Sequence, residues 1–309
     1  MSKRWQMAAA MAALGLATLP FQPALSAGGG GGGGASMPSA SAPQYDPVEE
    51  YRRGIEAYQA KDYKKAASAF DRVVAVVPNH APAQYLLGAS HIGLSNFKKA
   101  RKSLEAAVKA DPAMLEAQRD LGIAYGKLGD AAKAAAQVEK LQALKTTCAG
   151  TCPQSAQIDA ALEAVNGAMT GAPPQALGPG RFLAPLASID SSYVAAVTLI
   201  NKDEFDPAIV LLQESLWNAG PHPDLLTYLG FANRKLGRYG QASRWYQQAL
   251  AVAPRHRGAL EYYGELKLER GDRAGALAHL TRLEQICGFG CQEADELRSW
   301  INGERPSAS

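Results

Sequence analysis

Small and large apolar residues recur along this chain with a fixed long period. Six alanines form two trios, and within each trio the alanines are 34 residues apart. The first trio ends at Ala134 and the second begins at Ala208, so the trios are separated by one period plus a 40-residue insertion (208 − 134 = 74; 74 − 34 = 40). The six positions are Ala66, Ala100, Ala134, Ala208, Ala242 and Ala276. Such a period predicts stacked copies of one small structural unit.

Neighbouring positions repeat in the same register. Twelve residues before the alanines the side chain is small or absent, and four residues after them it is bulky and apolar. Helices cross closely where side chains are small, and a bulky residue one turn later fills the gap against the next pair. The pattern predicts pairs of antiparallel helices that stack, because each pair has an apolar face that only its neighbour covers. The small positions are Gly54, Gly88, Gly122, Ala196, Gly230 and Gly264, and the bulky ones are Phe70, Leu104, Val138, Leu212, Tyr246 and Leu280.

This pattern resembles the tetratricopeptide-repeat family. The resemblance covers roughly residues 47–148 and 189–290, and it implies an all-α solenoid of about six helix-turn-helix units in two groups of three. The family's fold implies protein binding but does not identify the partner. The matching residues are Leu87-Gly88, Leu121-Gly122-x-x-Tyr125 and Leu229-Gly230 for the first helix, and Tyr239-x-x-Ala242-x-x-x-Tyr246 with Pro254 for the second.

Each group of three units is followed by a segment that predicts a capping helix. Residues 154–167 place Ile158, Leu162 and Val165 on one helical face, and residues 293–301 form the second such segment. A solenoid needs a cap to cover its last apolar surface. The sequence therefore predicts repeats 1–3 with a cap over 47–168, a Pro/Gly-rich linker over 169–188, repeats 4–6 with a cap over 189–303, and a tail over 304–309.

The N-terminus has the layout of a secretory signal peptide. Lys3 and Arg4 precede a short apolar run, and small residues end the segment at Ala27. No cysteine follows the run, so an acylated lipoprotein is not indicated, and we expect a periplasmic or secreted protein. Contact with a membrane is expected only if the signal stays uncleaved. The glycine-rich residues 28–46 predict a flexible tether.

Charge argues against a nucleic-acid partner. The chain has 32 basic and 29 acidic residues, and residues 1–27 hold two of the basic ones and no acidic one. The mature chain therefore has 30 against 29 (32 − 2 = 30) and is nearly neutral. Nothing in that balance favours binding to nucleic acid or to an anionic membrane.

Four cysteines lie in two equivalent turns, one after each repeat group. Cys148 and Cys152 enclose Ala-Gly-Thr, and Cys287 and Cys291 enclose Gly-Phe-Gly. In an oxidising compartment these pairs are interpreted first as local disulfides that fix each cap against its last repeat. A redox-active dithiol and a four-cysteine zinc site remain as alternatives.

Other chemical signals are weak. The five histidines show no metal-ligand spacing, and they are interpreted as turn or surface residues. No nucleophile elbow or phosphate-binding loop is present in the sequence. We therefore expect no enzymatic activity, no catalytic residue, no bound metal and no cofactor.

First helices line the concave groove of such solenoids, and their side chains decide what binds there. Tyrosine is frequent among them and offers a large contact area with a polar tip. We predict a groove for protein or peptide segments, suited to an apolar or aromatic segment. The predicted groove residues are Tyr51, Ile55, Tyr58, Tyr85, Ala89 and Ile92 in the first half, and Tyr193, Tyr228, Phe231, Arg234, Lys235 and Tyr262 in the second.

Two function classes follow from these features. The first is a periplasmic, non-enzymatic scaffold or adaptor that docks protein segments during envelope assembly, secretion or surface-polymer export. The second is a thiol-disulfide or metal-dependent activity at the cysteine turns. Titration of free thiols in the native protein separates the two classes.

Overall fold

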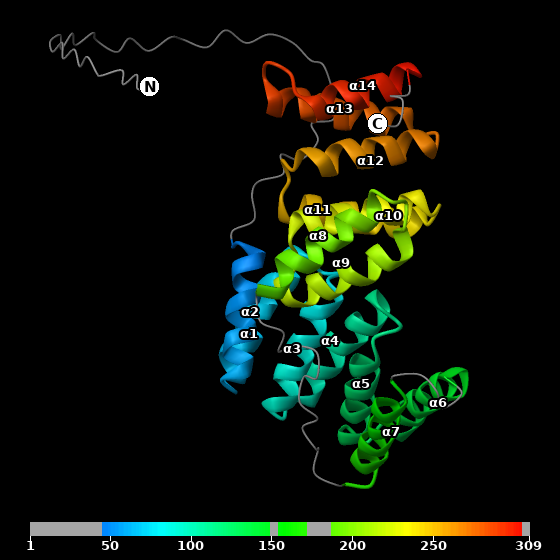
Figure 1. Ribbon diagram of the computed structural model, residues 1–309. Coiled ribbons are helices and arrows are strands. Elements are labelled where there is room, and N and C mark those ends of the chain that lie inside the picture. The colour runs from blue at the N-terminus through cyan, green and yellow to red at the C-terminus, as the bar shows by residue number, and fades with distance from the viewer. Residues whose placement is uncertain (1–44, 149–153, 172–186, 305–309) are drawn as a thin grey trace, which may run out of the picture. The chain divides into compact units, whose positions relative to one another are not determined.

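The computed structural model describes residues 45–148, 154–171 and 187–304, and within them every regular element is a helix (Figure 1). The predicted signal segment 1–27, and most of the tether and the linker, lie outside the described residues. The helices of the first repeat group are α1 (Pro47–Gln59), α2 (Tyr63–Val76), α3 (Ala81–Gly93), α4 (Phe97–Ala110), α5 (Leu115–Lys127) and α6 (Ala131–Cys148), followed by α7 (Ser155–Met169). Those of the second group are α8 (Ala187–Ile200), α9 (Phe205–Ala219), α10 (Pro223–Lys235), α11 (Tyr239–Val252), α12 (Arg257–Glu269) and α13 (Arg273–Cys287), followed by α14 (Gln292–Asn302).

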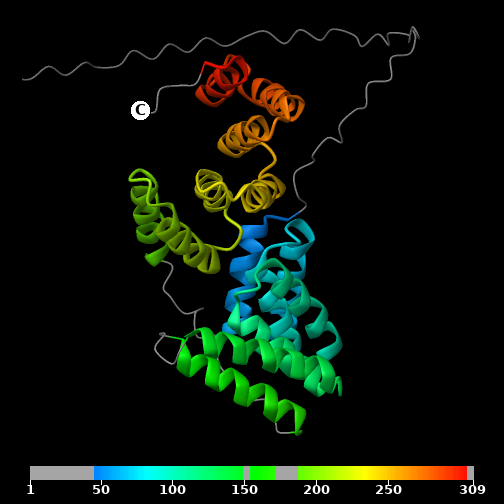
Figure 2. The same cartoon turned by 90° about the vertical axis from the view of Figure 1, so that its right-hand side faces the viewer.

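This arrangement confirms the predicted all-α fold of helix pairs. The six pairs α1/α2 to α5/α6 and α8/α9 to α12/α13 begin in the register that the alanines set, and α7 and α14 follow the two groups. The helices of the second group succeed one another in chain order from α8 to α14 (Figure 2). All described helices belong to one compact unit, Ala40–Ser309. In the part of the chain that the structure describes, no helix combines the length and apolarity that a membrane span requires.

The turn inside each helix pair has the same backbone conformation in all six units. One residue of each turn is left-handed, with φ of 58° at Lys61, 54° at Ser95, 59° at Asp203 and 76° at Gly129. The other two units have glycine there, Gly237 and Gly271. Only glycine adopts this conformation without steric cost, so the three non-glycine turns are held by the helices on either side.

The residue after the left-handed position directly precedes the second helix. In four units it is Asp or Asn, and its side chain accepts a backbone N–H three residues on, as Asp62 does from Lys65 and Asp272 from Gly275. Such caps satisfy a backbone donor that the first helical turn leaves free. The 34-residue period therefore repeats both the turn and the N-terminal end of the second helix from one unit to the next.

The small and bulky positions of the repeat meet within one helix pair, which corrects the prediction that the bulky residue fills the gap against the next pair. A Cβ atom on Gly54 would lie 2.6 Å from the Phe70 ring, and one on Gly88 would lie 2.6 Å from Leu104. At the last repeat of each group the bulky side chain comes from the cap instead. Val165 of α7 covers Gly122, and Leu297 of α14 covers Gly264 at 2.6 Å. The cap helices thus complete the close packing that the last repeat lacks.

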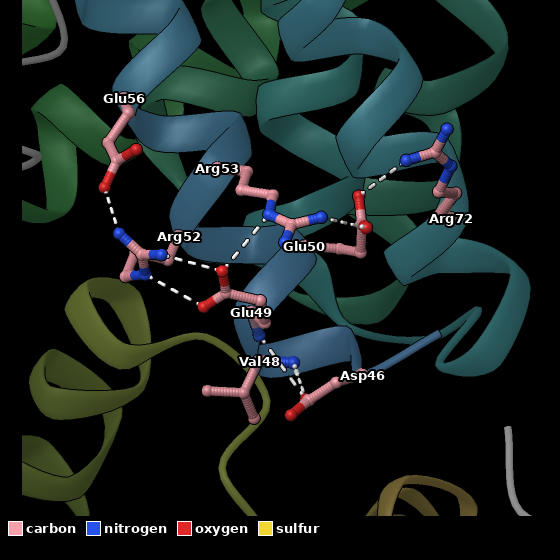
Figure 3. A network of polar contacts seen from close by, with 8 residues as sticks. All are labelled: Asp46, Val48, Glu49, Glu50, Arg52, Arg53, Glu56 and Arg72. Carbon is pink, nitrogen blue, oxygen red and sulfur yellow. Dashed lines mark hydrogen bonds and ion pairs between the residues drawn. The ribbon is translucent and has the colours of Figure 1, made fainter. Parts of the chain in front are cut away.

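A polar network secures the first helix to the second (Figure 3). Asp46 accepts the N–H of Val48 at 2.9 Å and caps α1. The Glu50 carboxylate is buried between two guanidinium groups, those of Arg53 at 3.2 Å and of Arg72 on α2 at 3.0 Å. A buried carboxylate needs such partners because burial removes its hydration.

Candidate functional site

The repeat register places one residue of every first helix at the same point of the first-helix face. In the first repeat of each group this residue is tyrosine, at Tyr51 and Tyr193, and in the second repeat Tyr85 occupies the same position. The three tyrosines have different surroundings in the structure. Tyr51 and Tyr85 are buried, whereas Tyr193 is partly exposed.

The first group's tyrosines are covered by the end of α9. The Tyr51 hydroxyl donates to the Trp217 carbonyl oxygen at 2.8 Å, and the rings of Tyr85 and Trp217 are 5.9 Å apart at their centroids. Gly220 follows with φ of 75°, and a Cβ there would lie 2.6 Å from the Tyr51 ring. Burial raises the pKa of the Tyr51 and Tyr85 hydroxyls. Both side chains are therefore packing residues, which corrects the prediction that they line an accessible groove.

The other predicted groove residues of the first group have mixed surroundings. Ile55, Tyr58 and Ile92 are partly exposed and pack against the group's core, and Tyr58 meets Tyr63 edge-on at 5.5 Å. Ala89 is buried and therefore does not line an open groove either. The first group thus presents a short apolar surface rather than the row of tyrosines that we predicted.

In the second group four aromatic side chains form a row across three first helices. Tyr193 of α8 meets Tyr228 of α10 at 5.8 Å, and Phe231, one turn further along α10, meets Tyr262 of α12 at 5.1 Å. All four are partly exposed. We call these four residues the aromatic face. Edge-to-face and tilted contacts of this kind hold the rings in defined positions, so their exposed parts form a pre-organised apolar surface.

Two basic residues of α10 lie against the aromatic face but differ in exposure. Arg234 is buried, and its guanidinium pairs with Glu265 at 2.5 Å and with Glu269 at 3.0 Å. It therefore acts within the fold, which corrects its prediction as an accessible groove residue. Lys235 is exposed, with its ammonium 5.3 Å from the centre of the Phe231 ring.

Carboxylates border the aromatic face on α12 and α14. Glu261, Glu265 and Glu296 belong to this acidic edge, and Glu261 and Glu265 are buried. Burial, followed by the hydrogen bond with Glu296, raises the pKa of Glu261 to about 10. The same hydrogen bond lowers the pKa of Glu296. At neutral pH Glu261 is consequently the protonated partner and donates to the Glu296 carboxylate.

Sequence reasoning missed two parts of this site. Trp217 gave no signal, because it lies on a second helix and its contacts depend on how the groups meet. Glu261 and Glu296 could have been found from the register, since Glu261 occupies the position of Tyr193 and Glu296 that of Tyr262 (261 − 193 = 68, two periods; 296 − 262 = 34, one period).

Three histidines serve as helix starts, in agreement with their interpretation as turn residues. His80, His222 and His256 are the N-cap residues of α3, α10 and α12. His80 Nδ1 accepts the N–H of Ala83 at 3.2 Å, and burial lowers the pKa of this imidazole to about 3. Within the three described stretches of chain, no three His, Cys, Asp or Glu side chains gather in a metal-binding group.

Only one of the two cysteine turns is described at side-chain level. Cys287 and Cys291 are joined in the structure, with Cα atoms 5.7 Å apart, and Cys291 is the N-cap residue of the cap helix α14. This distance lies in the usual range for a disulfide. The side chain of Cys148 and the whole of Cys152 lie outside the described residues, so the disulfide there remains a prediction.

Comparison with known proteins identifies the repeats by family. Family models described as "Tetratricopeptide repeat" match residues 57–113 and 223–256. No curated protein matches the chain.

Comparison with solved structures finds repeat proteins that are similar to this chain at low sequence identity and low TM-score. The TPR2AB domain of yeast Sti1, solved as a complex with pHSP90, is 17% identical over 83% of this chain and 98% of that one, with a TM-score of 0.35. The TPR domain of P58(IPK) is 16% identical over 84% and 65%, with a TM-score of 0.33. PilW, a type IV pilus biogenesis factor, is 14% identical over 81% and 96%, with a TM-score of 0.31. These likenesses concern the fold alone.

Proposed function

The chain is a tetratricopeptide-repeat protein, and we propose that it is a non-enzymatic periplasmic scaffold that docks segments of other polypeptides on the aromatic face. The observation that carries this proposal is the row Tyr193, Tyr228, Phe231 and Tyr262. These rings remain partly exposed on the first helices, while Tyr51 and Tyr85, which occupy the register position of Tyr193 in the first group, are buried. The fold itself is one that serves as a protein-interaction scaffold.

Physical chemistry favours a polypeptide segment as the ligand of this face. Aromatic rings supply a large contact area at a small cost in side-chain entropy, since each has only two rotatable bonds. The rings already hold one another by edge contacts, so little further ordering is lost on binding. An extended or helical segment with apolar side chains fits a row that crosses three successive helices.

The periplasmic location rests on the sequence. Residues 1–27 have the layout of a signal peptide, and the four cysteines are paired by spacing. The scaffold would then act in envelope assembly, secretion or surface-polymer export. Fractionation of producing cells and N-terminal sequencing test the location, and the expected mature protein starts at Gly28. A protein found only in the cytoplasm with residues 1–27 intact would contradict the proposal.

Affinity capture from periplasmic extract tests the docking face. The bait is the mature protein, and the test variant combines Tyr228→Ala, Phe231→Ala and Tyr262→Ala. The matched control combines Tyr239→Ala and Trp245→Ala, which remove partly exposed aromatic rings from α11, a second helix. We expect a partner that the wild type and the control retain and the test variant loses. Equal capture by all three baits would reject the aromatic face.

A further inference from the structure

The character of the first-helix face changes from aromatic to acidic along the second group. One register position holds Tyr228 on α10, Tyr262 on α12 and Glu296 on α14, each 34 residues after the last. The neighbouring position holds Tyr193 on α8 and Glu261 on α12. The two carboxyl groups of Glu261 and Glu296 therefore continue the same row that the aromatic rings begin.

Glu261 is buried without a complete set of partners. Its side chain is 3% exposed, and its Oε1 atom accepts no hydrogen bond. The buried Arg234 guanidinium pairs with Glu265 and Glu269. Arg257, at the start of α12, pairs with Glu293 at 3.3 Å. Among the described residues, no lysine or arginine forms an ion pair with Glu261 or Glu296.

Glu296 is the partly exposed residue of the pair, and hydrogen bonds hold its side chain in place. Gln292 Nε2 donates to its Oε1 atom at 2.6 Å, and Glu261 shares a hydrogen bond with it. A carboxyl group and a carboxylate in contact carry one negative charge between them. Since Glu296 and Tyr262 are both partly exposed, this charge lies at the edge of the aromatic face rather than sealed below it.

We propose that the Glu261–Glu296 pair receives a lysine or arginine side chain of the docked segment, with Tyr262 alongside; the inference rests on the proposed docking face. An ammonium or guanidinium group supplies donors to the partly exposed Glu296 carboxylate, which carries the charge of the pair, while the buried Glu261 holds that carboxylate by its hydrogen bond. The same face already places cations against rings, since the Arg234 guanidinium lies 5.5 Å and the Lys235 ammonium 5.3 Å from the Phe231 centroid. The preferred segment is therefore one with apolar residues and a basic residue at a fixed distance from them.

Selection of random 12-residue peptides on phage tests the proposal, with the full mature chain as target. We expect the selected peptides to share a lysine or arginine at a constant spacing from aromatic or aliphatic residues. Glu296→Gln, which removes the charge of the pair, should lose the enrichment of the basic residue and keep that of the apolar ones. Glu261→Gln should keep both, because Glu261 is already uncharged. Glu261→Gln matches the shape of the protonated side chain, and thermal unfolding monitors the fold of both variants.

A matched control variant and a measurement of peptide affinity test the cation site further. Glu284→Gln removes an exposed carboxylate of α13 that pairs with Arg298, and it should select the same peptides as the wild type. For one selected peptide, replacing its basic residue by norleucine should weaken binding to the wild type about tenfold. The same replacement should leave binding to Glu296→Gln unchanged.

The outcomes separate this inference from the proposed function. Apolar peptides without an enriched basic residue would overturn the cation site and leave the docking face standing. A basic residue that Glu296→Gln still enriches as the wild type does would overturn it equally. If no peptide is selected at all, the docking face fails and the cation site fails with it.

Discussion

Tyr51 and Tyr193 occupy the same position in the first repeat of the two groups, yet only Tyr193 reaches the surface. Tyr51 is sealed by Trp217 and Gly220, whose contacts with it span more than 160 residues of sequence, as the hydrogen bond between residues 51 and 217 shows (217 − 51 = 166). The four rings of the second group's aromatic face stay partly exposed, so no described residue covers them in that way. The comparison shows that one repeat register can serve as a packing surface in one group and as an open surface in the other.

The two groups also differ at a second register position. Arg234 of the second group occupies the place of Ile92 in the first (234 − 92 = 142; 74 + 2 × 34 = 142). Ile92 packs against the apolar core, while Arg234 is the centre of a buried ion-pair network with Glu265 and Glu269. The second group therefore has a charged interior directly beneath its aromatic face.

Removal of Tyr51 should have the largest effect. Tyr51→Ala deletes a fully buried ring and its hydrogen bond to Trp217, and we expect a loss of about 3–5 kcal/mol in the free energy of unfolding. Tyr228→Ala, on the aromatic face, should cost about 1–2 kcal/mol because its ring is only partly buried. Urea unfolding followed by circular dichroism measures both. Equal losses would show that the two faces do not differ as described.

Loss of the buried Arg234 guanidinium should have the second-largest effect on stability. Arg234→Met leaves the Glu265 carboxyl buried without its partner, and we expect destabilisation of about 3 kcal/mol. The double variant Arg234→Met, Glu265→Leu should recover most of that loss, because it removes both charges. Urea unfolding of the two variants provides the measurement. A double variant as unstable as the single one would mean that Arg234 acts through packing alone.

The buried imidazole of His80 should make stability depend on pH. Its pKa falls from 6.5 when exposed to about 3 when folded, so the unfolded chain binds the proton more readily. The contribution of His80 is complete above pH 6.5 and falls as pH decreases, by about 2 kcal/mol at pH 5 (1.5 pH units at 1.36 kcal/mol each). Because burial also shifts the pKa of Glu261 and of His279, urea unfolding at pH 7 and pH 5 measures this contribution as the difference between the wild type and a His80 variant.

Substitution of His80 isolates its contribution to the pH dependence of the free energy of unfolding. His80→Asn keeps a capping acceptor for Ala83 and does not titrate, so this variant should lose about 2 kcal/mol less than the wild type between pH 7 and pH 5. A pH dependence unaltered by His80→Asn would contradict the assignment.

The cysteine turns should have the smallest effect. Cys287→Ser with Cys291→Ser opens a loop of only five residues, and we expect destabilisation of at most about 2 kcal/mol. The same change at Cys148 and Cys152 should match it if the two groups are equivalent there. Thiol titration and mass spectrometry of the native protein should find no free thiol. Reactive thiols or a bound metal would favour the alternative activity at these turns instead.

Several parts of this architecture were predictable because they depend on short-range contacts. The 34-residue period predicted the helix pairs and a cap after each group, and the structure adds the fit of Gly54 against Phe70 and of Gly88 against Leu104. Each of these features involves residues within one unit or in adjacent units. The sequence pattern of one repeat and its neighbour therefore contains all the information that they require.

The sequence by itself determined the helices, their register, and which residues lie on the first helices. Only the tertiary structure decided which of those residues are covered, because Trp217 reaches Tyr51 and Tyr85 across a sequence separation that no period encodes. It also decided the state of the acidic edge, since Glu261 becomes a protonated partner only when burial and Glu296 act on it together. The local sequence pattern determines on which helix and at which register position a side chain lies. Its exposure and its charge depend on the residues that long-range packing brings into contact with it.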